Sequence, residues 1–318
     1  MKQIGLEFVA QGEVGFYDLE APQDPGPKQV LIETVYSAVT NGTERHRLLT
    51  EHGFGGGNYP ARVGYQVVGP IVAVGSEVTR FREGDWVFCG EHGGHRGWKL
   101  VEEDGLLVGL ADTVDRKHCA LFGVACVALR AVRRMGVSGG DNVWVVGQGP
   151  VGNFVGQAAR AMGAQVTVTD LVAKRLEVAQ ICGAHRVLNG DHPDVWERLS
   201  AAGPFDYIYD CCSVENLFFD IREHRLLAHG GTIGAMAVRD TVTFPWGMLH
   251  ARVEGKIEVA CHFLPDDLRV LRFLYEQGTV RTEPLVSHVG PIEEAAGAYE
   301  RLARRAEDLL GVIFEWQT

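Results

Sequence analysis

The sequence of 318 residues has no pair of cysteines in a C-x-x-C arrangement, which excludes a zinc lobe built from four cysteines. Its cysteines number seven, which is odd, and most of them lie in apolar segments. Cysteines of this kind are typical of buried, reduced thiols and not of a disulfide framework. We therefore expect free thiols.

Two further absences restrict location and partners. No apolar run approaches the length of a membrane span, and the first residues lack a signal-peptide pattern, so we expect a cytoplasmic protein with no membrane partner. The formal net charge is −11, and no local basic stripe compensates for it. A broad nucleic-acid surface is excluded because phosphate backbones require a basic footprint. The rest of the composition is that of a globular protein long enough for two domains.

The stretch from residue 143 to residue 162 organises the rest of the chain. An apolar run, Val143–Val146, leads directly into the pattern G-x-G-x-x-G formed by Gly147, Gly149 and Gly152, and a helix is predicted over Asn153–Met162. In this context the first glycine makes a tight turn, the second lets backbone approach a pyrophosphate, and the third lets the helix pack close to the strand. The pattern predicts a dinucleotide-binding turn.

Other residues complete the predicted cofactor site. Pro150 and Val151 lie at the start of the helix, whose N-terminus attracts phosphates. Asp170 follows a second strand, where an acid binds ribose hydroxyls and repels a 2′-phosphate, so NAD is predicted as the cofactor and NADP is disfavoured. Arg175, in the next helix, and Cys211, whose backbone follows another strand end, belong to the same set.

The order of the predicted elements defines three segments. Residues 1–118 carry short alternating strands separated by Gly and Pro, as in a β-rich domain. Residues 119–264 alternate strands and helices, which predicts an α/β domain, a Rossmann doubly wound sheet of six parallel strands. Residues 265–318 contain two helices and a final apolar strand that returns to the sheet of the first domain.

Within these segments, some predictions concern single elements. A long strand is predicted over Gly64–Gly75, with a break at Gly69 and Pro70. A helix is predicted over Leu217–Leu227, capped by Gly230 and Gly231.

This order of parts resembles the medium-chain dehydrogenase/reductase superfamily. The resemblance rests on the turn Gly84–Val87, the phrase Gly140–Val143 before the glycines, and the C-terminal return. It implies a GroES-like catalytic domain beside the Rossmann domain, a small-molecule substrate, and a homodimer or homotetramer. The phrases Thr40–Glu44 and Gly64–Gln66 are most similar to the bacteriochlorophyllide hydroxyethyl dehydrogenase group, which implies oxidation of a secondary alcohol.

The sequence departs from the zinc-containing members at the metal ligands. Asn41 stands where those members carry a cysteine thiolate, and Tyr65 and Gln66 replace the His and Glu of their G-H-E phrase. Their other metal cysteine falls near Gly123. Because zinc needs N or S ligands from three such positions, we expect no zinc. A shifted ligand at Cys126 is the alternative.

Catalysis without a metal requires another group to hold the charge that develops on the substrate oxygen. Tyr65 is the predicted general acid/base, although its unperturbed pKa near 10 demands a nearby cation, and packing is the alternative role. Thr43 and His46 match the proton-relay residues of the family. Asn41 and Gln66 are predicted to hydrogen-bond the substrate hydroxyl, or to stabilise their loop.

Two histidines are predicted substrate contacts. His95 belongs to a polar glycine loop, and His262 is expected to end the last strand of the parallel sheet, where doubly wound folds bind ligands. Glu44 and Arg45 are interpreted as a local ion pair. The glycine-rich stretch Thr50–Pro60 is a candidate lid.

Three functions remain open at this point. The first is a zinc-independent, NAD-dependent dehydrogenase acting on a secondary alcohol or the matching ketone. The second is a zinc-free quinone or enoyl reductase that uses NADPH, which Asp170 disfavours. The third is an NAD-binding protein without catalysis.

Overall fold

The computed structural model describes residues 1–51, 58–250 and 253–317, and the chain divides into two compact units. The first unit comprises Met1–Gly123, Leu264–Glu276 and Leu285–Thr318. The second comprises Val124–Phe263 and Gln277–Pro284. Most of the proposed lid, residues 52–57, lies outside the described residues. None of the helices in these ranges is both long and apolar enough to cross a bilayer.

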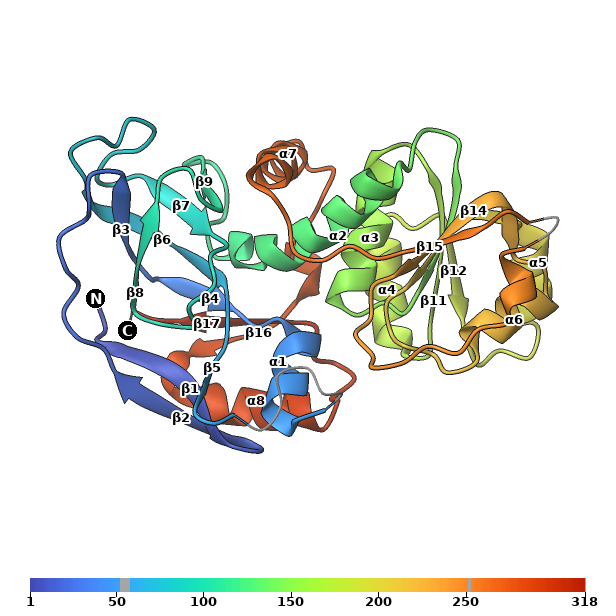
Figure 1. Cartoon of the computed structure of the whole chain (residues 1–318), viewed down its shortest axis with the longest axis horizontal. Helices are drawn as coiled ribbons and strands as arrows, with labels where there is room; N and C mark the ends of the chain where they lie inside the picture. The colour runs from blue at the N-terminus through green and yellow to red at the C-terminus, as the bar shows by residue number, and fades with distance from the viewer. Residues whose placement is uncertain (52–57, 251–252, 318) are drawn as a thin grey trace. The chain divides into compact units, whose positions relative to one another are not determined.

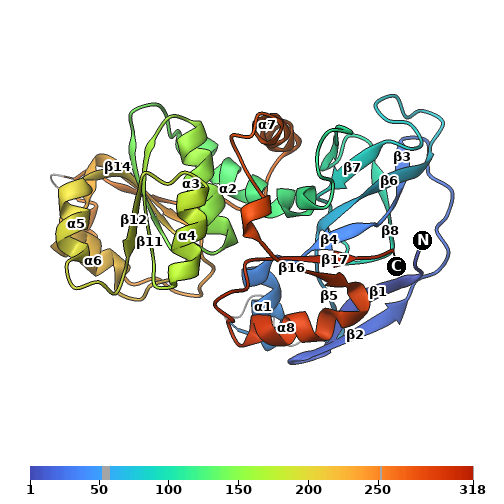
Figure 2. The ribbon, with the colours of Figure 1, turned by 180° about the vertical axis from the view of Figure 1, so that it is seen from behind.

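The second unit is built on a six-stranded sheet in which every neighbouring pair is parallel. The strand order is β12-β11-β10-β13-β14-β15, which is that of a doubly wound sheet. Six parallel strands in such a sheet are predicted from the sequence. Helices α3 and α4 cover one face and α5 and α6 the other (Figures 1 and 2). The strands are Asn142–Val146 (β10), Gln165–Asp170 (β11), Arg186–Asn189 (β12), Phe205–Asp210 (β13), Leu227–Ala235 (β14) and Lys256–Glu258 (β15). The helices are Phe122–Met135 (α2), Pro150–Ala161 (α3), Ala173–Ile181 (α4), Val195–Ala202 (α5) and Leu217–Glu223 (α6).

The first unit contains two sheets. A three-stranded sheet has the order β2-β1-β5, and a larger sheet runs β16-β17-β4-β6-β3-β8, with β7 and β9 joined to it through β6. The C-terminal strand β17 pairs with β4, as the predicted return to this domain requires. The strands are Ile4–Ala10 (β1), Glu13–Asp18 (β2), Gln29–Glu33 (β3), Tyr36–Ala38 (β4), Ala61–Arg62 (β5), Gln66–Val74 (β6), Trp86–Cys89 (β7), Trp98–Glu102 (β8), Leu107–Gly109 (β9), Val286–Pro291 (β16) and Gly311–Glu315 (β17).

Three helices accompany these sheets: Asn41–Leu49 (α1), Pro265–Glu276 (α7) and Ala295–Ala303 (α8). Helices α1 and α8 lie side by side in both views (Figures 1 and 2). Their apolar faces meet β1 and β17 in a buried cluster that includes Leu48, Ala295 and Phe314. This packing fixes α1, on which three of the predicted catalytic residues lie.

The predicted break in β6 is wrong, because the strand continues through Gly69 and Pro70. Residues before the pair are bonded to β4 and residues after it to β3, so the strand changes partners there and tolerates a proline without an N–H. A Cβ on Gly69 would lie 1.7 Å from the carbonyl oxygen of Glu33, which requires glycine.

The predicted cap of α6 is also wrong. The helix ends at Glu223, and Arg225 makes the turn with a φ of +53°. Gly230 and Gly231 lie within β14, which begins at Leu227.

Candidate active site and cofactor site

The glycine turn after β10 has the geometry that the sequence pattern requires. Gly147 has a φ of +88°, in the left-handed region, and a Cβ there would lie 2.7 Å from the Cβ of Cys212. A Cβ on Gly152 would lie 1.9 Å from the carbonyl oxygen of Gly147. A Cβ on Gly149 would meet nothing within 4 Å. Gly147 and Gly152 therefore shape the turn. Gly149 faces open space in front of helix α3, which begins at Pro150.

Asp170, at the end of β11, is bound to this turn. Its Oδ2 accepts a hydrogen bond from the backbone N–H of Gln148 at 2.6 Å, and its Oδ1 accepts one from Val172 at 2.8 Å. Arg175 Nη1 lies 4.0 Å from Oδ2. Each carboxylate oxygen retains a lone pair for a further donor. The acid is therefore held in a fixed orientation beside the dinucleotide-binding turn.

The end of β13, the strand that pairs with β10, contains an ion pair that sequence reasoning missed. Asp210, the last residue of β13, is fully buried and forms an ion pair with Arg239, beyond the end of β14. Its Oδ1 accepts hydrogen bonds from the N–H groups of Cys212 and Ser213, at 3.3 and 2.9 Å. The pair joins the loops that follow two adjacent strands. The only signal in the sequence was a charged residue at the end of an apolar strand.

Cys211 lies beside the predicted cofactor site, whereas His262 does not lie at the strand end where it was expected. Cys211 donates its backbone N–H to Val146 at 3.0 Å, beside the dinucleotide-binding turn, and burial raises the pKa of its thiol well above the usual value. His262 does not end the last strand as expected, because β15 ends at Glu258. It lies in the following segment with a φ of +57°.

Helix α1 carries Asn41, Thr43 and His46. Asn41 donates from Nδ2 to the carbonyl oxygen of Leu310 at 2.7 Å, and its buried Oδ1 has no hydrogen-bond partner within the described ranges. Thr43 is exposed. His46 places Nδ1 3.1 Å from Oε2 of Glu51. Thr43 and His46 are three residues apart and therefore share a face of the helix.

The structure brings together Tyr65, Gln66 and Gly123. A Cβ on Gly123 would lie 2.6 Å from Cε2 of Tyr65 and 2.7 Å from Oε1 of Gln66. Gln66 is fully buried and donates from Nε2 to the carbonyl oxygen of Ala38 at 3.1 Å. A phenol ring and an amide therefore fill the space that a side chain at position 123 would need.

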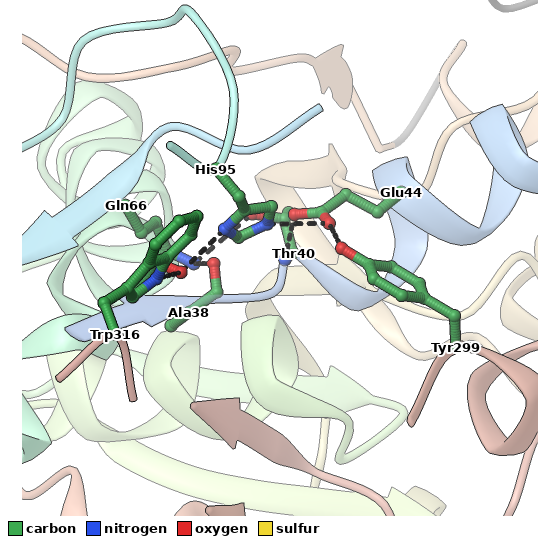
Figure 3. Close-up of polar contacts among 8 residues, drawn as sticks. Ala38, Thr40, Glu44, Gln66, His95, Tyr299 and Trp316 are labelled. Carbon is green, nitrogen blue, oxygen red and sulfur yellow. Dashed lines mark hydrogen bonds and ion pairs between the residues drawn. The ribbon is translucent and has the colours of Figure 1, made fainter. Parts of the chain in front are cut away.

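Glu44 is the centre of a buried network that sequence reasoning did not anticipate (Figure 3). Its Oε1 accepts a hydrogen bond from the backbone N–H of Thr40 at 2.7 Å. Its Oε2 lies 3.1 Å from Nε2 of His95 and also accepts the hydroxyl of Tyr299. Burial and the carboxylate of Glu44 raise the pKa of Tyr299 well above 10, so the phenol remains a donor.

The network continues beyond His95. Nδ1 of His95 lies 2.9 Å from Oγ of Ser37, which also accepts the indole N–H of Trp316 at 2.9 Å. Both ring nitrogens of His95 therefore have partners within the network, which leaves neither for a substrate. His95 has no exposed surface, so its position does not support the predicted substrate contact.

The predicted ion pair between Glu44 and Arg45 is wrong. Adjacent residues of a helix point in different directions, and Glu44 points into the core while Arg45 pairs with Glu51. Burial raises the pKa of Glu51, but hydrogen bonds and charge from Arg45 and His46 outweigh it and lower the pKa overall.

No group of three or more His, Cys, Asp or Glu side chains within residues 1–51, 58–250 and 253–317 has an arrangement that could hold a metal ion. At the positions that the sequence resemblance assigns to zinc ligands, the side chains are an amide at Asn41, a phenol at Tyr65 and an amide at Gln66, and Gly123 has none. Neutral groups of this kind do not fit a tetrahedral N/S zinc site.

Two protein-family models match this chain. The family model described as "Alcohol dehydrogenase GroES-like domain" matches residues 26–111, and the one described as "Zinc-binding dehydrogenase" matches residues 150–267. The chain belongs to the medium-chain dehydrogenase/reductase superfamily. Its first unit is a GroES-like domain and its second a Rossmann domain, as predicted, and the chain is an oxidoreductase of the medium-chain type.

Curated relatives within this superfamily match nearly the whole chain. The 2-desacetyl-2-hydroxyethyl bacteriochlorophyllide A dehydrogenase of Rhodobacter capsulatus is 29% identical over 92% of each chain. The sorbitol dehydrogenase of Ovis aries is 28% identical over 94% of this chain and 93% of its own.

Solved structures agree with the medium-chain fold. An Escherichia coli oxidoreductase/dehydrogenase of unknown specificity matches over 100% of both chains, with a TM-score of 0.86 and 20% identity. The 2R,3R-butanediol dehydrogenase of Bacillus subtilis matches over 99% of both chains, with a TM-score of 0.84 and 19% identity.

Proposed function

We propose that this medium-chain oxidoreductase is zinc-independent and NAD-dependent, and that it transfers hydride between the nicotinamide and a secondary alcohol or its ketone. The observation that carries the proposal is the set of side chains at the positions of the zinc ligands. Asn41, Tyr65 and Gln66 are neutral, and a side chain at position 123 would collide with two of them. Catalytic zinc requires ligands that this set does not supply.

The choice of NAD is supported by Asp170. Its carboxylate is held by two backbone N–H groups beside the glycine turn, so it cannot readily swing away from an approaching 2′-phosphate. Repulsion between the two anions disfavours NADP. Bound NAD supplies the hydride acceptor, and the turn Gly147–Gly152 would hold its pyrophosphate.

The choice of an alcohol substrate is supported by the resemblance at Thr40–Glu44 and Gly64–Gln66, and by the names of relatives. A hydroxyethyl bacteriochlorophyllide, sorbitol and butanediol are all alcohols. In this proposal Tyr65 exchanges the proton of the substrate hydroxyl, Asn41 and Gln66 orient that hydroxyl, and Thr43 and His46 belong to a proton relay. His262 stays a predicted substrate contact. A cytoplasmic homodimer or homotetramer belongs to the same proposal.

The test combines metal analysis with cofactor titration. We expect zinc well below one equivalent per chain, and NAD binding that is tighter than NADP binding. Stoichiometric zinc that is required for turnover would overturn zinc independence and move attention to Cys126, His92 and His95. Preference for NADPH with turnover of a quinone or an enone would establish the reductase instead. Tight NAD binding without turnover of any alcohol, ketone, quinone or enone would indicate a protein without catalysis.

A further inference from the structure

The ring of His92 contacts the ring of Tyr65, with centroids 5.5 Å apart and planes at 53°. Two backbone hydrogen bonds hold the loop of His92 against the segment of Tyr65. The N–H of Gly94 donates to the carbonyl oxygen of Gly64 at 3.0 Å, and the N–H of His95 donates to that of Val63 at 2.7 Å. The backbone segments that carry the two rings are therefore held next to each other.

The two rings differ in their access to water. Tyr65 is 8% exposed, whereas His92 is an exposed residue. The contact therefore connects a buried phenol to an imidazole that can exchange protons with solvent.

This arrangement addresses a chemical difficulty in the proposed function. A phenol with a pKa near 10 has almost no phenolate at neutral pH, so it cannot by itself remove the proton of an alcohol. Imidazole titrates near neutrality and exists there partly as a base. A phenol that gives its proton to an imidazole while it receives one from the substrate needs no prior ionisation.

We propose that His92 is a positioning residue that acts through Tyr65 and accepts its proton. In alcohol oxidation, bound NAD would supply the acceptor for the carbinol hydrogen and its electron pair. The hydroxyl proton passes to the oxygen of Tyr65, the phenol proton passes to a ring nitrogen of His92, and His92 releases a proton to water. Ketone reduction runs the same transfers in reverse. This inference rests on the proposed function.

The relay that the proposed function assigns to Thr43 and His46 on helix α1 is the alternative route for this proton, which His92 would replace. His46 differs from His92 in that its Nδ1 lies 3.1 Å from the carboxylate of Glu51, which also pairs with Arg45. The two histidines can be tested separately by parallel substitution, because His46 lies on helix α1 and His92 lies in the loop between β7 and β8.

The experiment compares His92→Ala with His46→Ala in the intact protein, using a panel of secondary alcohols that includes sorbitol and butane-2,3-diol. We expect His92→Ala to lower kcat by about 10²- to 10⁴-fold, the range for a lost proton-transfer group, with KM and the Kd for NAD unchanged. Free imidazole added to the buffer should restore kcat in proportion to its concentration, because position 92 is open to solvent. Tyr65→Phe should lose a similar factor and should not respond to imidazole.

The outcomes separate the inference from the function on which it rests. If the wild type turns over an alcohol and His92→Ala keeps its rate, or if His46→Ala alone is rescued by imidazole, the role of His92 is wrong and the proposed function stands. If the wild type binds NAD but oxidises none of the alcohols, both fail. Should His92→Ala fold poorly, His92→Gln keeps the size and polarity of the side chain and should lose the same activity. A loss of activity without rescue by imidazole would leave His92 a packing residue.

Discussion

Nε2 of His95 and Oε2 of Glu44 are 3.1 Å apart, and the two side chains are 0% and 2% exposed. The carboxylate at this position accepts three donors, from Thr40, His95 and Tyr299, which belong to three different parts of the first unit. One residue of α1 therefore ties the start of that helix to the loop of His95 and to α8.

The first prediction is that Glu44→Gln destabilises the first unit. The amide would turn an NH₂ group toward groups that donate, so at least one buried donor would lose its acceptor. We expect a loss of about 1–3 kcal/mol in the free energy of unfolding, measured with urea. Glu51→Gln, on a partly exposed acid near the same helix, should cost at most about 1 kcal/mol. Equal effects of the two substitutions would contradict the account of Glu44.

Two alanine substitutions in the glycine turn should have opposite consequences. Gly149→Ala should leave the melting temperature unchanged, since the new methyl meets open space, but should weaken NAD binding by at least about tenfold by occupying the place of the pyrophosphate. Gly152→Ala forces a methyl against the carbonyl of Gly147 and should cost about 1–3 kcal/mol or more in stability. Calorimetry of folding and of NAD binding measures both. Normal NAD affinity in Gly149→Ala would remove this turn from the cofactor site.

Asp170→Ala should relax the discrimination against NADP. The substitution removes a negative charge near the 2′-phosphate, and we expect the ratio of the Kd values for NADP and NAD to fall by about tenfold or more. The affinity for NAD should also decrease, because Gln148 and Val172 lose their acceptor. Glu177→Ala, on an exposed acid of helix α4, is the matched control for charge alone. A ratio that changes equally in both variants would argue against Asp170 as the selective residue.

Cys212 should be a slow nucleophile despite its exposure. Desolvation of the sulfur, and next the charge of Asp170, raise the pKa of its thiol to about 11. The thiolate is the reactive form, so at pH 8 only about one molecule in a thousand is competent. Alkylation by iodoacetamide, followed by peptide mass spectrometry, should accelerate about tenfold per pH unit up to pH 11. NAD should slow it, because Cys212 packs against Gly147. Rapid labelling at pH 7 would show that the sulfur is not desolvated.

The second unit was predictable because its signals are local. Buried parallel strands appear as continuous apolar runs, and the predicted run Val143–Val146 lies within the observed strand β10. The error at α6 has a physical cause. Leu226 and Leu227 suit a helix end and a strand start equally well, and the positive φ of Arg225 is not visible in the residue type.

The candidate site was less predictable because its contacts are remote in sequence. Glu44 is 51 positions from His95 and 255 from Tyr299, so no periodicity or motif relates them. Tyr65 and Asn41 are candidates from the sequence because they replace residues in a recognisable phrase. His92 was not, since its relation to Tyr65 depends on two loops lying against each other.

The first unit is built from segments at both ends of the sequence, and this affects the order in which the chain folds during synthesis. Its larger sheet needs β17, which pairs with β4 across most of the sequence, and Trp316 bonds to Ser37. The sheet of the second unit uses only residues 142–258. On the ribosome, therefore, the sheet of the second unit can form while the unit translated first still lacks its last strands, a reversal of the usual N-to-C order of domain folding.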